Sequence, residues 1–278
     1  MNKRNFKPRR AIEKRYAKAI EAIMIGLRRR LANAKSPFMM LSILRGVARS
    51  PTFDREARRA AKIMVTQIAS DGHKTWREAA RYGSKGKLLY KLLKKELEET
   101  PVYREIIDSN SKLIKSMAEQ TAEKVSRLIA EKQADGIRSD AMIDDILSEW
   151  PSLTKAHAKL IARTETSKAS TTLTRVRAEG AGIDWYVWKT SEDVRVRSSH
   201  AHMNGVLINW KDPPSPEALI RMKNYGYYHA GEFPNCRCYP APLVDYSDVS
   251  WPHKVYRNGK IQFMTLANFK KLNEGEDK

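Results

Sequence analysis

Apolar and charged positions alternate along the first third of the chain with the period of an α-helix. Near the start, apolar residues recur at steps of three or four, which places them on one stripe with arginines opposite. The stripe consists of Ile12, Tyr16, Ile20, Ile23, Leu27 and Leu31. This pattern predicts a helix that packs one face against a core or a partner.

Further helices are predicted up to about residue 150. Asp71-Gly72 and Gly83-Ser84-Lys85-Gly86 read as turns between short helices. A long periodic run follows Pro101 and ends at Asp135-Gly136. Its apolar face comprises Ile106, Leu113, Met117, Thr121, Val125 and Leu128. The run fits either an intrachain bundle helix or a helix that packs on a neighbouring subunit.

The pattern changes character in the second half of the chain. Pro151 is expected to end a short helix that begins at Ser139, and Thr154 to begin another that stops at Gly180. Beyond it, residues 185–188 and 206–208 have strand composition. Asn258-Gly259 lies between two short apolar runs and predicts a hairpin.

These elements predict an α+β fold. A mainly helical, basic N-terminal region would occupy residues 1–150, and a small α+β domain with short antiparallel strands residues 151–250. A C-terminal hairpin with a short helix or tail would occupy residues 251–278. A chain of 278 residues is long enough for two domains.

The net charge of +20 lies mostly at one end of the chain. Residues 1–62 contain 18 Lys and Arg against 4 Asp and Glu, a net charge of +14. Such an excess favours contact with nucleic-acid phosphates or an acidic protein surface. The basic residues that are candidates for binding DNA are Arg9, Arg10, Lys14, Arg15, Arg28, Arg29 and Arg30. Zinc-finger spacing and glycine-rich phosphate loops are absent from the sequence, so sequence-specific DNA reading is not expected.

Other features bound the environment in which the protein is expected to work. No apolar stretch approaches the roughly 20 residues that cross a bilayer, and the basic start of the chain lacks a signal-peptide core. Cys236 and Cys238 are the two cysteines, and a bridge between them would close a small, strained ring. We therefore expect no membrane association and a reducing cytoplasm.

Ordered blocks of residues between positions 156 and 243 carry a family resemblance. They are Ala162-Arg163-Thr164-Glu165, then Trp185 to Trp188, then Asp193 to Arg197 with His200 and Gly205, and finally Phe233-Pro234-Asn235-Cys236-Arg237-Cys238. Together they resemble the phage Mu protein F-like family, which includes the head morphogenesis proteins of phage SPP1. The residues that match its motifs are Arg163, Glu165, Asp193, Arg195, Arg197, His200, Gly205, Asn235, Cys236, Arg237 and Cys238.

The resemblance implies a minor capsid protein of a tailed bacteriophage, and not an enzyme. Its implied location is the head interior of the virion, with the host cytoplasm during assembly. Its implied partners are the portal protein, the major capsid or scaffolding protein and packaged double-stranded DNA. Where family members often carry Pro-Gly, this chain reads Ala230-Gly231-Glu232, which keeps the glycine. Residues 1–150 show no family motif.

The His and Cys residues of these blocks leave two interpretations open. His200, His202, Cys236 and Cys238 offer two imidazoles and two thiols, a set that could close a tetrahedral zinc site. Alternatively, both cysteines are small buried apolar residues and His200 is hydrogen-bonded to Asp193 or Glu165. The arginines of the motifs would then form structural ion pairs with nearby carboxylates.

Two other functions stay open from the residues alone. One is a non-specific DNA-binding accessory protein, which the basic N-terminal third would support. The other is a metal-dependent hydrolase or nuclease, with His200 or His202 as general base and Glu165 or Asp193 as its orienting group.

Overall fold

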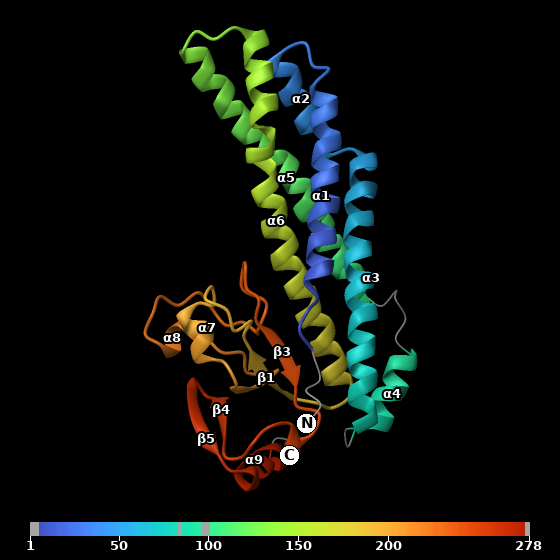
Figure 1. The fold of residues 1–278 in the computed structure, drawn as a ribbon, viewed down its shortest axis with the longest axis vertical. Coiled ribbons are helices and arrows are strands. Elements are labelled where there is room, and N and C mark those ends of the chain that lie inside the picture. Colours follow the sequence, from blue (N-terminus) through green and yellow to red (C-terminus); the bar gives the residue numbers. More distant parts are fainter. Residues whose placement is uncertain (1–5, 83–84, 96–100, 276–278) are drawn as a thin grey trace. The chain divides into compact units, whose positions relative to one another are not determined.

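The computed structural model describes residues 6–82, 85–95 and 101–275, and it confirms the α+β fold class (Figure 1). Part of the predicted turn at residues 83–86 lies outside the described residues. The helices are α1 (Arg10–Leu31), α2 (Pro37–Ala48), α3 (Pro51–Tyr82), α4 (Gly86–Lys95), α5 (Pro101–Ala134), α6 (Ser139–Gly180), α7 (Ser198–His202), α8 (Pro216–Leu219) and α9 (Leu266–Gly275). The strands are β1 (Trp185–Lys189), β2 (Leu207–Asn209), β3 (Tyr239–Pro242), β4 (His253–Arg257) and β5 (Lys260–Met264), and Tyr246–Asp248 form a short 3₁₀ helix.

The chain folds into two compact units, and neither is continuous in sequence. The helical unit comprises Arg10–Gln67 and Glu99–Thr166, and the sheet unit comprises Met1–Arg9, Ile68–Glu98 and Ser167–Lys278. Helices α3 and α6 contribute residues to both units. Because both units are discontinuous, they do not test whether residues 1–150 and 151–250 fold separately, and those bounds stay a prediction.

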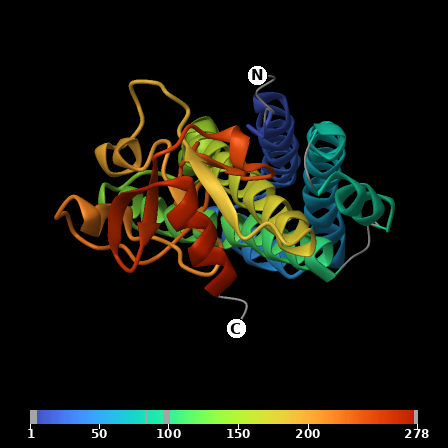
Figure 2. The ribbon, with the colours of Figure 1, turned by 90° about the horizontal axis from the view of Figure 1, so that it is seen from below.

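Long helices that run alongside one another form the helical unit (Figures 1 and 2). The predicted stripe of α1 is confirmed, except that Ile23 is only half-buried and Met24 is buried in its place. In α5 the predicted face is also largely correct, although Leu113 and Leu128 are half-buried. Tyr16 donates a hydrogen bond to the Asn110 side chain over 2.9 Å and so links α1 to α5 within the core.

Helix α6 does not end at Pro151, so the predicted break is wrong. Proline lacks the N–H that would bond to the carbonyl of Leu147, four residues earlier. In the structure, the Arg28 Nε of α1 donates to that carbonyl over 3.0 Å. In the next turn, the Thr154 hydroxyl donates to the Trp150 carbonyl over 2.9 Å. Side chains thus satisfy the carbonyl that proline leaves open, and the helix continues to Gly180.

The predicted turn at Asp71-Gly72 is also wrong, because α3 runs through it. A Cβ atom at Gly72 would collide with the guanidinium of Arg177, which lies in the same unit. That guanidinium donates to the Ala69 carbonyl over 3.2 Å. Gly72 therefore leaves space for the Arg177 guanidinium against the α3 backbone. It lies inside a continuous helix and does not form a turn.

Five strands form one sheet, in the order β3-β1-β2-β4-β5. Adjacent strands are antiparallel except β2 and β4, which are parallel. The predicted hairpin is confirmed, since Arg257 pairs with Lys260 across Asn258 and Gly259. Both turn residues have positive φ, 48° and 78°, as a two-residue hairpin turn requires.

The two faces of the sheet carry different cores. Trp185 lies in one cluster with Phe269, because α9 covers that face (red helix beside the sheet, Figure 2). Trp188 lies in the other cluster, which includes Trp76 of α3 and Leu89 of α4. The two tryptophans are three residues apart, so the alternation of a strand turns them to opposite faces, as their spacing predicts.

Candidate functional site

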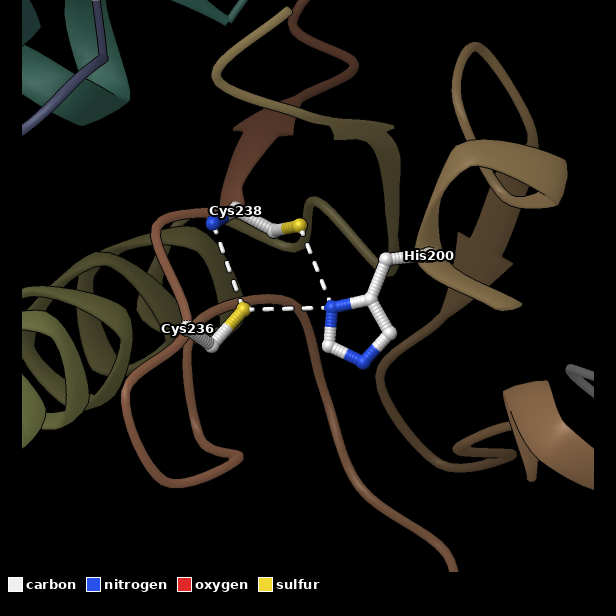
Figure 3. A group of neighbouring side chains, drawn as sticks. All are labelled: His200, Cys236 and Cys238. Carbon is white, nitrogen blue, oxygen red and sulfur yellow. Dashed lines mark hydrogen bonds between the residues drawn. The ribbon is translucent and has the colours of Figure 1, made fainter. Parts of the chain in front are cut away.

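The side chains of His200, Cys236 and Cys238 converge in the sheet unit (Figure 3). His200 lies in α7, and the cysteines lie in the loop that leads into β3. Their ligand atoms lie within 4.8 Å of one another. All three side chains are buried, at 2%, 2% and 3% exposure respectively. Three groups able to bind a metal thus meet at one point inside the fold.

A tight turn makes both thiols face His200. The Cys236 N–H donates to the Phe233 carbonyl over 3.0 Å, and Asn235 adopts a positive φ of 61°. The Cys238 N–H then donates to the Cys236 sulfur over 3.3 Å. The chain therefore curls around Cys236, and a spacing of two residues brings both sulfurs to one side.

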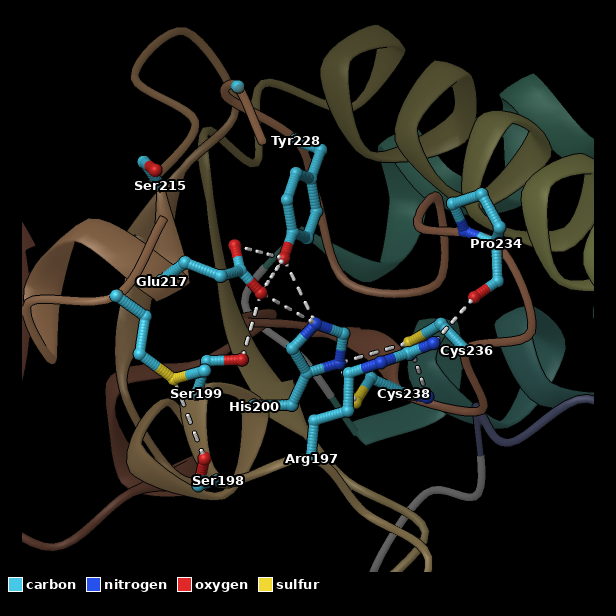
Figure 4. Close-up of polar contacts among 12 residues, drawn as sticks. Arg197, Ser198, Ser199, His200, Ser215, Glu217, Tyr228, Pro234, Cys236 and Cys238 are labelled. Carbon is cyan, nitrogen blue, oxygen red and sulfur yellow. Dashed lines mark hydrogen bonds and ion pairs between the residues drawn. The ribbon is translucent and has the colours of Figure 1, made fainter. Parts of the chain in front are cut away.

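The other ring nitrogen of His200 belongs to a buried polar chain (Figure 4). His200 Nε2 lies 3.0 Å from the Tyr228 hydroxyl, which donates over 2.8 Å to Glu217. The Ser199 hydroxyl also donates to Glu217, over 2.9 Å. Because the Tyr228 proton goes to the carboxylate, its oxygen accepts from Nε2–H of His200. Nδ1 is then the bare nitrogen, and it faces the two sulfurs.

The two thiols share protons unequally in the metal-free protein. The hydrogen bond from Cys238 lowers the pKa of Cys236, although burial opposes this. The pKa of Cys238 is raised, because it donates that hydrogen bond and is itself buried. Cys236 is therefore the more acidic thiol of the pair.

Aromatic rings surround the histidine. Trp188 and Phe233 each meet the His200 ring edge to face, with centroids 5.7 and 5.9 Å away. This apolar surround lowers the local dielectric and strengthens any charge interaction at the cluster.

A paired Asp and Arg brace the loop between the cysteines. Arg237 donates to both carboxylate oxygens of Asp193, over 2.5 and 2.6 Å. This hydrogen bonding holds the pKa of Asp193 at about 2, and the Arg195 N–H adds a third bond over 3.0 Å. This pair is one of the kind expected of the motif arginines and nearby carboxylates. Since Arg237 lies between the two cysteines, the pair fixes the direction in which they point.

Two other motif residues support the same loops. Arg197 donates to the Pro234 carbonyl over 3.2 Å and lies over the Phe233 ring, 4.8 Å from its centroid. Gly205 has a φ of +82°, which favours glycine. Another glycine, Gly231, has a φ of +94°, and a Cβ atom there would lie 2.9 Å from the Cys238 carbonyl. Gly231 is the glycine that this chain retains in Ala230-Gly231-Glu232, where family members often carry Pro-Gly. Its positive φ and the nearby Cys238 carbonyl explain why a residue with a side chain would not fit there.

Several predicted site residues do not join the cluster. His202 is exposed, so it is not a fourth ligand of the set. Glu165 and Arg163 belong to the helical unit, where Arg163 pairs with Glu13 over 3.2 Å. Asp193 is engaged with Arg237. The ring nitrogens of His200 face Tyr228 and the two cysteines, and no described contact joins the ring to Asp193, which was one of the two expected partners.

Glu217 and Tyr228 are the partners of His200 that sequence reasoning missed. Glu217 follows Pro213-Pro214-Ser215-Pro216, a run that reads as an exposed loop, yet its side chain is 3% exposed. Ser215 and Pro216 begin the short helix α8, which turns Glu217 inward. The available signal was a carboxylate directly after a proline at a helix start, which is weak alone.

The candidate DNA-binding residues of the N-terminal region are exposed, and some have protein partners. Arg9 forms an ion pair with Asp71 over 2.6 Å, and Arg28 bonds to the Leu147 carbonyl. Along α1 the others gather near its two ends, at residues 10–15 and 28–30. The two groups are separated by about 20 Å of helix, at 1.5 Å per residue. They do not form one continuous stripe.

Two comparisons with known proteins match part of the chain. Residues 108–240 match the family described as "Phage Mu protein F like protein". The match begins within α5, so the expectation that residues 1–150 carry no family signal is wrong. An uncharacterized protein of Haemophilus influenzae is 32% identical over 136 residues. These cover 49% of this chain and 28% of that protein.

No solved structure matches the chain. Among the described helices, none has an apolar stretch sufficient to cross a membrane.

Proposed function

Because residues 108–240 belong to the phage Mu protein F-like family, we propose that the protein is a minor head protein of a tailed bacteriophage. It would take part in head morphogenesis, reside inside the head and contact the portal, capsid or scaffolding protein. The family match is the observation that carries this proposal.

An apolar patch at the start of α2 supports contact with another head protein. Phe38 and Met39 are 63% and 44% exposed, while Met40 and Leu41 behind them are buried. Exposed large apolar side chains next to each other are typical of protein interaction sites. We propose that this patch takes part in binding a head protein.

Counting the protein in phage particles tests the role directly. Quantitative mass spectrometry of purified procapsids and virions would compare this chain with the portal subunit. A small, constant number of copies per portal is the expected result. If the protein is missing from both particles, the head role is wrong and the DNA-binding or enzymatic alternatives replace it.

A second candidate, contact with DNA phosphates, is supported by a basic hollow in the sheet unit. A hollow of about 600 Å³ lies between the end of α3 and α4. Arg77, Arg81, Lys87 and Lys91 line it together with Tyr90, and none of its described lining residues is acidic. Four cationic side chains around an open hollow suit a polyanion without sequence preference. We propose this hollow as the DNA contact, in preference to the scattered arginines of α1.

A third candidate, hydrolysis with a histidine as general base, has less support. The carboxylate nearest to His200 is Glu217, whose Oε1 lies 3.8 Å from Nε2, and both side chains are buried. Nε2 already donates to Tyr228, and Nδ1 faces sulfurs. The geometry favours metal binding over proton transfer to a substrate.

A further inference from the structure

We propose that His200 Nδ1, Cys236 Sγ and Cys238 Sγ bind one Zn²⁺ ion per chain, with water as the fourth ligand. This goes beyond the proposed function, because a structural role in a phage head does not by itself require a metal. The argument uses the geometry of the three ligand atoms, the groups around them and the chemistry of the donors.

The separations of the donors suit a tetrahedral zinc site. Zn–S bonds of about 2.3 Å and Zn–N bonds of about 2.0 Å place sulfur and nitrogen ligands about 3.5 Å apart. In the structure, Nδ1 of His200 lies 3.4 Å from Cys236 Sγ and 3.5 Å from Cys238 Sγ (Figure 3). All three ligand atoms lie within 4.8 Å of one another, and two Zn–S bonds at the tetrahedral angle need sulfurs about 3.8 Å apart, so a shift of about 1 Å at most would enclose the ion.

The surroundings orient His200 as metal-binding histidines are oriented. Its Nε2–H donates to Tyr228, and Tyr228 donates to Glu217, all within the buried interior (Figure 4). Such a chain fixes the tautomer and makes the free nitrogen a better ligand. Without a metal, the lone pair of Nδ1 faces both sulfurs inside the buried interior.

The donor set selects a soft or borderline ion and balances its charge. Two thiolates and an imidazole favour zinc over magnesium or calcium, which prefer oxygen. When the ion binds, each thiol that still carries a proton releases it to solvent, and two thiolates then neutralise the charge of Zn²⁺. A neutral complex fits a buried site lined by Trp188 and Phe233.

Zinc would join elements that are weak alone. Helix α7 has five residues, too few to be stable by itself, and the cysteine loop has no regular structure. A bond from each to one ion links α7 to the segment that enters β3. Three protein ligands leave one coordination position for a small molecule, which we assign to water.

Metal analysis of the purified full-length protein tests the proposal. Protein prepared under reducing conditions without chelator should contain about one zinc per chain. Cys236→Ser, Cys238→Ser and His200→Gln should each lose most of it. His202→Gln is the matched control, because His202 is two residues from His200 but exposed, and it should keep its zinc.

Cobalt substitution of the wild-type protein keeps the test valid if the variants fail to fold. Co²⁺ bound by the two thiolates should give intense thiolate-to-cobalt charge-transfer absorption with tetrahedral visible bands. Wild-type protein with neither zinc nor such absorption after anaerobic reconstitution would overturn the proposal. Equal loss of zinc in the His202 and His200 variants would overturn it as well, since an exposed adventitious ion would then be responsible.

Discussion

Two buried histidines in the sheet unit face opposite environments. His200 donates to a tyrosine that leads to a carboxylate, whereas His229 lies beside a cation. His229 Nε2 is 3.4 Å from Arg175, and Nδ1 is 3.2 Å from the Tyr186 hydroxyl. Burial, aided by the guanidinium, lowers the pKa of His229 from 6.5 to about 4. The ring is therefore neutral at physiological pH.

This neutral histidine predicts a loss of stability in mild acid. Between pH 6.5 and pH 4 the unfolded chain takes up a proton that the folded protein does not, so the free energy of unfolding falls as pH falls. The loss across this window should be on the order of 2 kcal/mol. Urea unfolding at several pH values measures it, and His229→Gln should show a shallower slope. Identical slopes in both proteins would contradict the assignment.

Single residues were the hardest part of the site to predict. The sequence indicates His200, Cys236 and Cys238 as candidate metal ligands because their types and spacing suit a metal. In the structure their ligand atoms lie close together. The sequence alone could not show that His200 is buried at the cluster while His202 is exposed. That difference depends on the orientation of the five-residue helix α7. Glu217 was missed because burial after a proline-rich run depends on tertiary packing.

At the level of elements, Pro151 in α6 shows how one contact overrides a local rule. The proline removes a backbone donor, and Arg28 supplies a donor from α1. Apolar periodicity identified α1 and α5, since burial of one face decides their formation. Strand composition and the Asn-Gly turn identified the strands other than β3 (Tyr239–Pro242), which the sequence analysis did not predict. Local sequence rules failed at two places in the helices. At Gly72 the guanidinium of Arg177 fills the space where a side chain would lie, and at Pro151 Arg28 donates to the carbonyl that the proline leaves without a partner.

The contact predicts a measurable coupling between Arg28 and Pro151. Arg28→Met should lower the free energy of unfolding by about 1 kcal/mol, because the Leu147 carbonyl loses its donor. In a Pro151→Ala background the restored N–H bonds to that carbonyl, so the same substitution should cost much less. Chemical denaturation of the four proteins gives the coupling energy. Arg29→Met, which removes an equal charge nearby, should show no coupling to residue 151.

For the whole molecule, the net charge of +20 matters more than any one arginine. The sequence located the excess in residues 1–62, but the structure adds a basic hollow at Arg77, Arg81, Lys87 and Lys91. This hollow was not predictable, because it forms where the ends of α3 and α4 approach. Composition predicts that a polyanion is attracted, while only the fold indicates where it would bind.

The hollow predicts salt-dependent binding of double-stranded DNA without sequence preference. Lys87→Ala combined with Lys91→Ala should weaken binding and reduce the slope of log Kd against log salt by about 2. Fluorescence anisotropy at a series of salt concentrations measures both. Lys155→Ala with Lys159→Ala, an equal loss of exposed charge on α6, is the control. If the control pair reduces the slope of log Kd against log salt by the same amount, the net charge of the protein accounts for DNA binding and the hollow is not a specific contact site.

Some of the residues that cover one face of the sheet lie outside the region that matches the family. The family match starts at residue 108, yet the core around Trp188 includes Trp76 and Leu89, which precede it. A fragment limited to residues 108–240 would lack these two side chains, and it would also lack β4, β5 and α9. The His-Cys cluster lies within that range, so such a fragment would carry the three ligands with only part of the sheet and core that surround them.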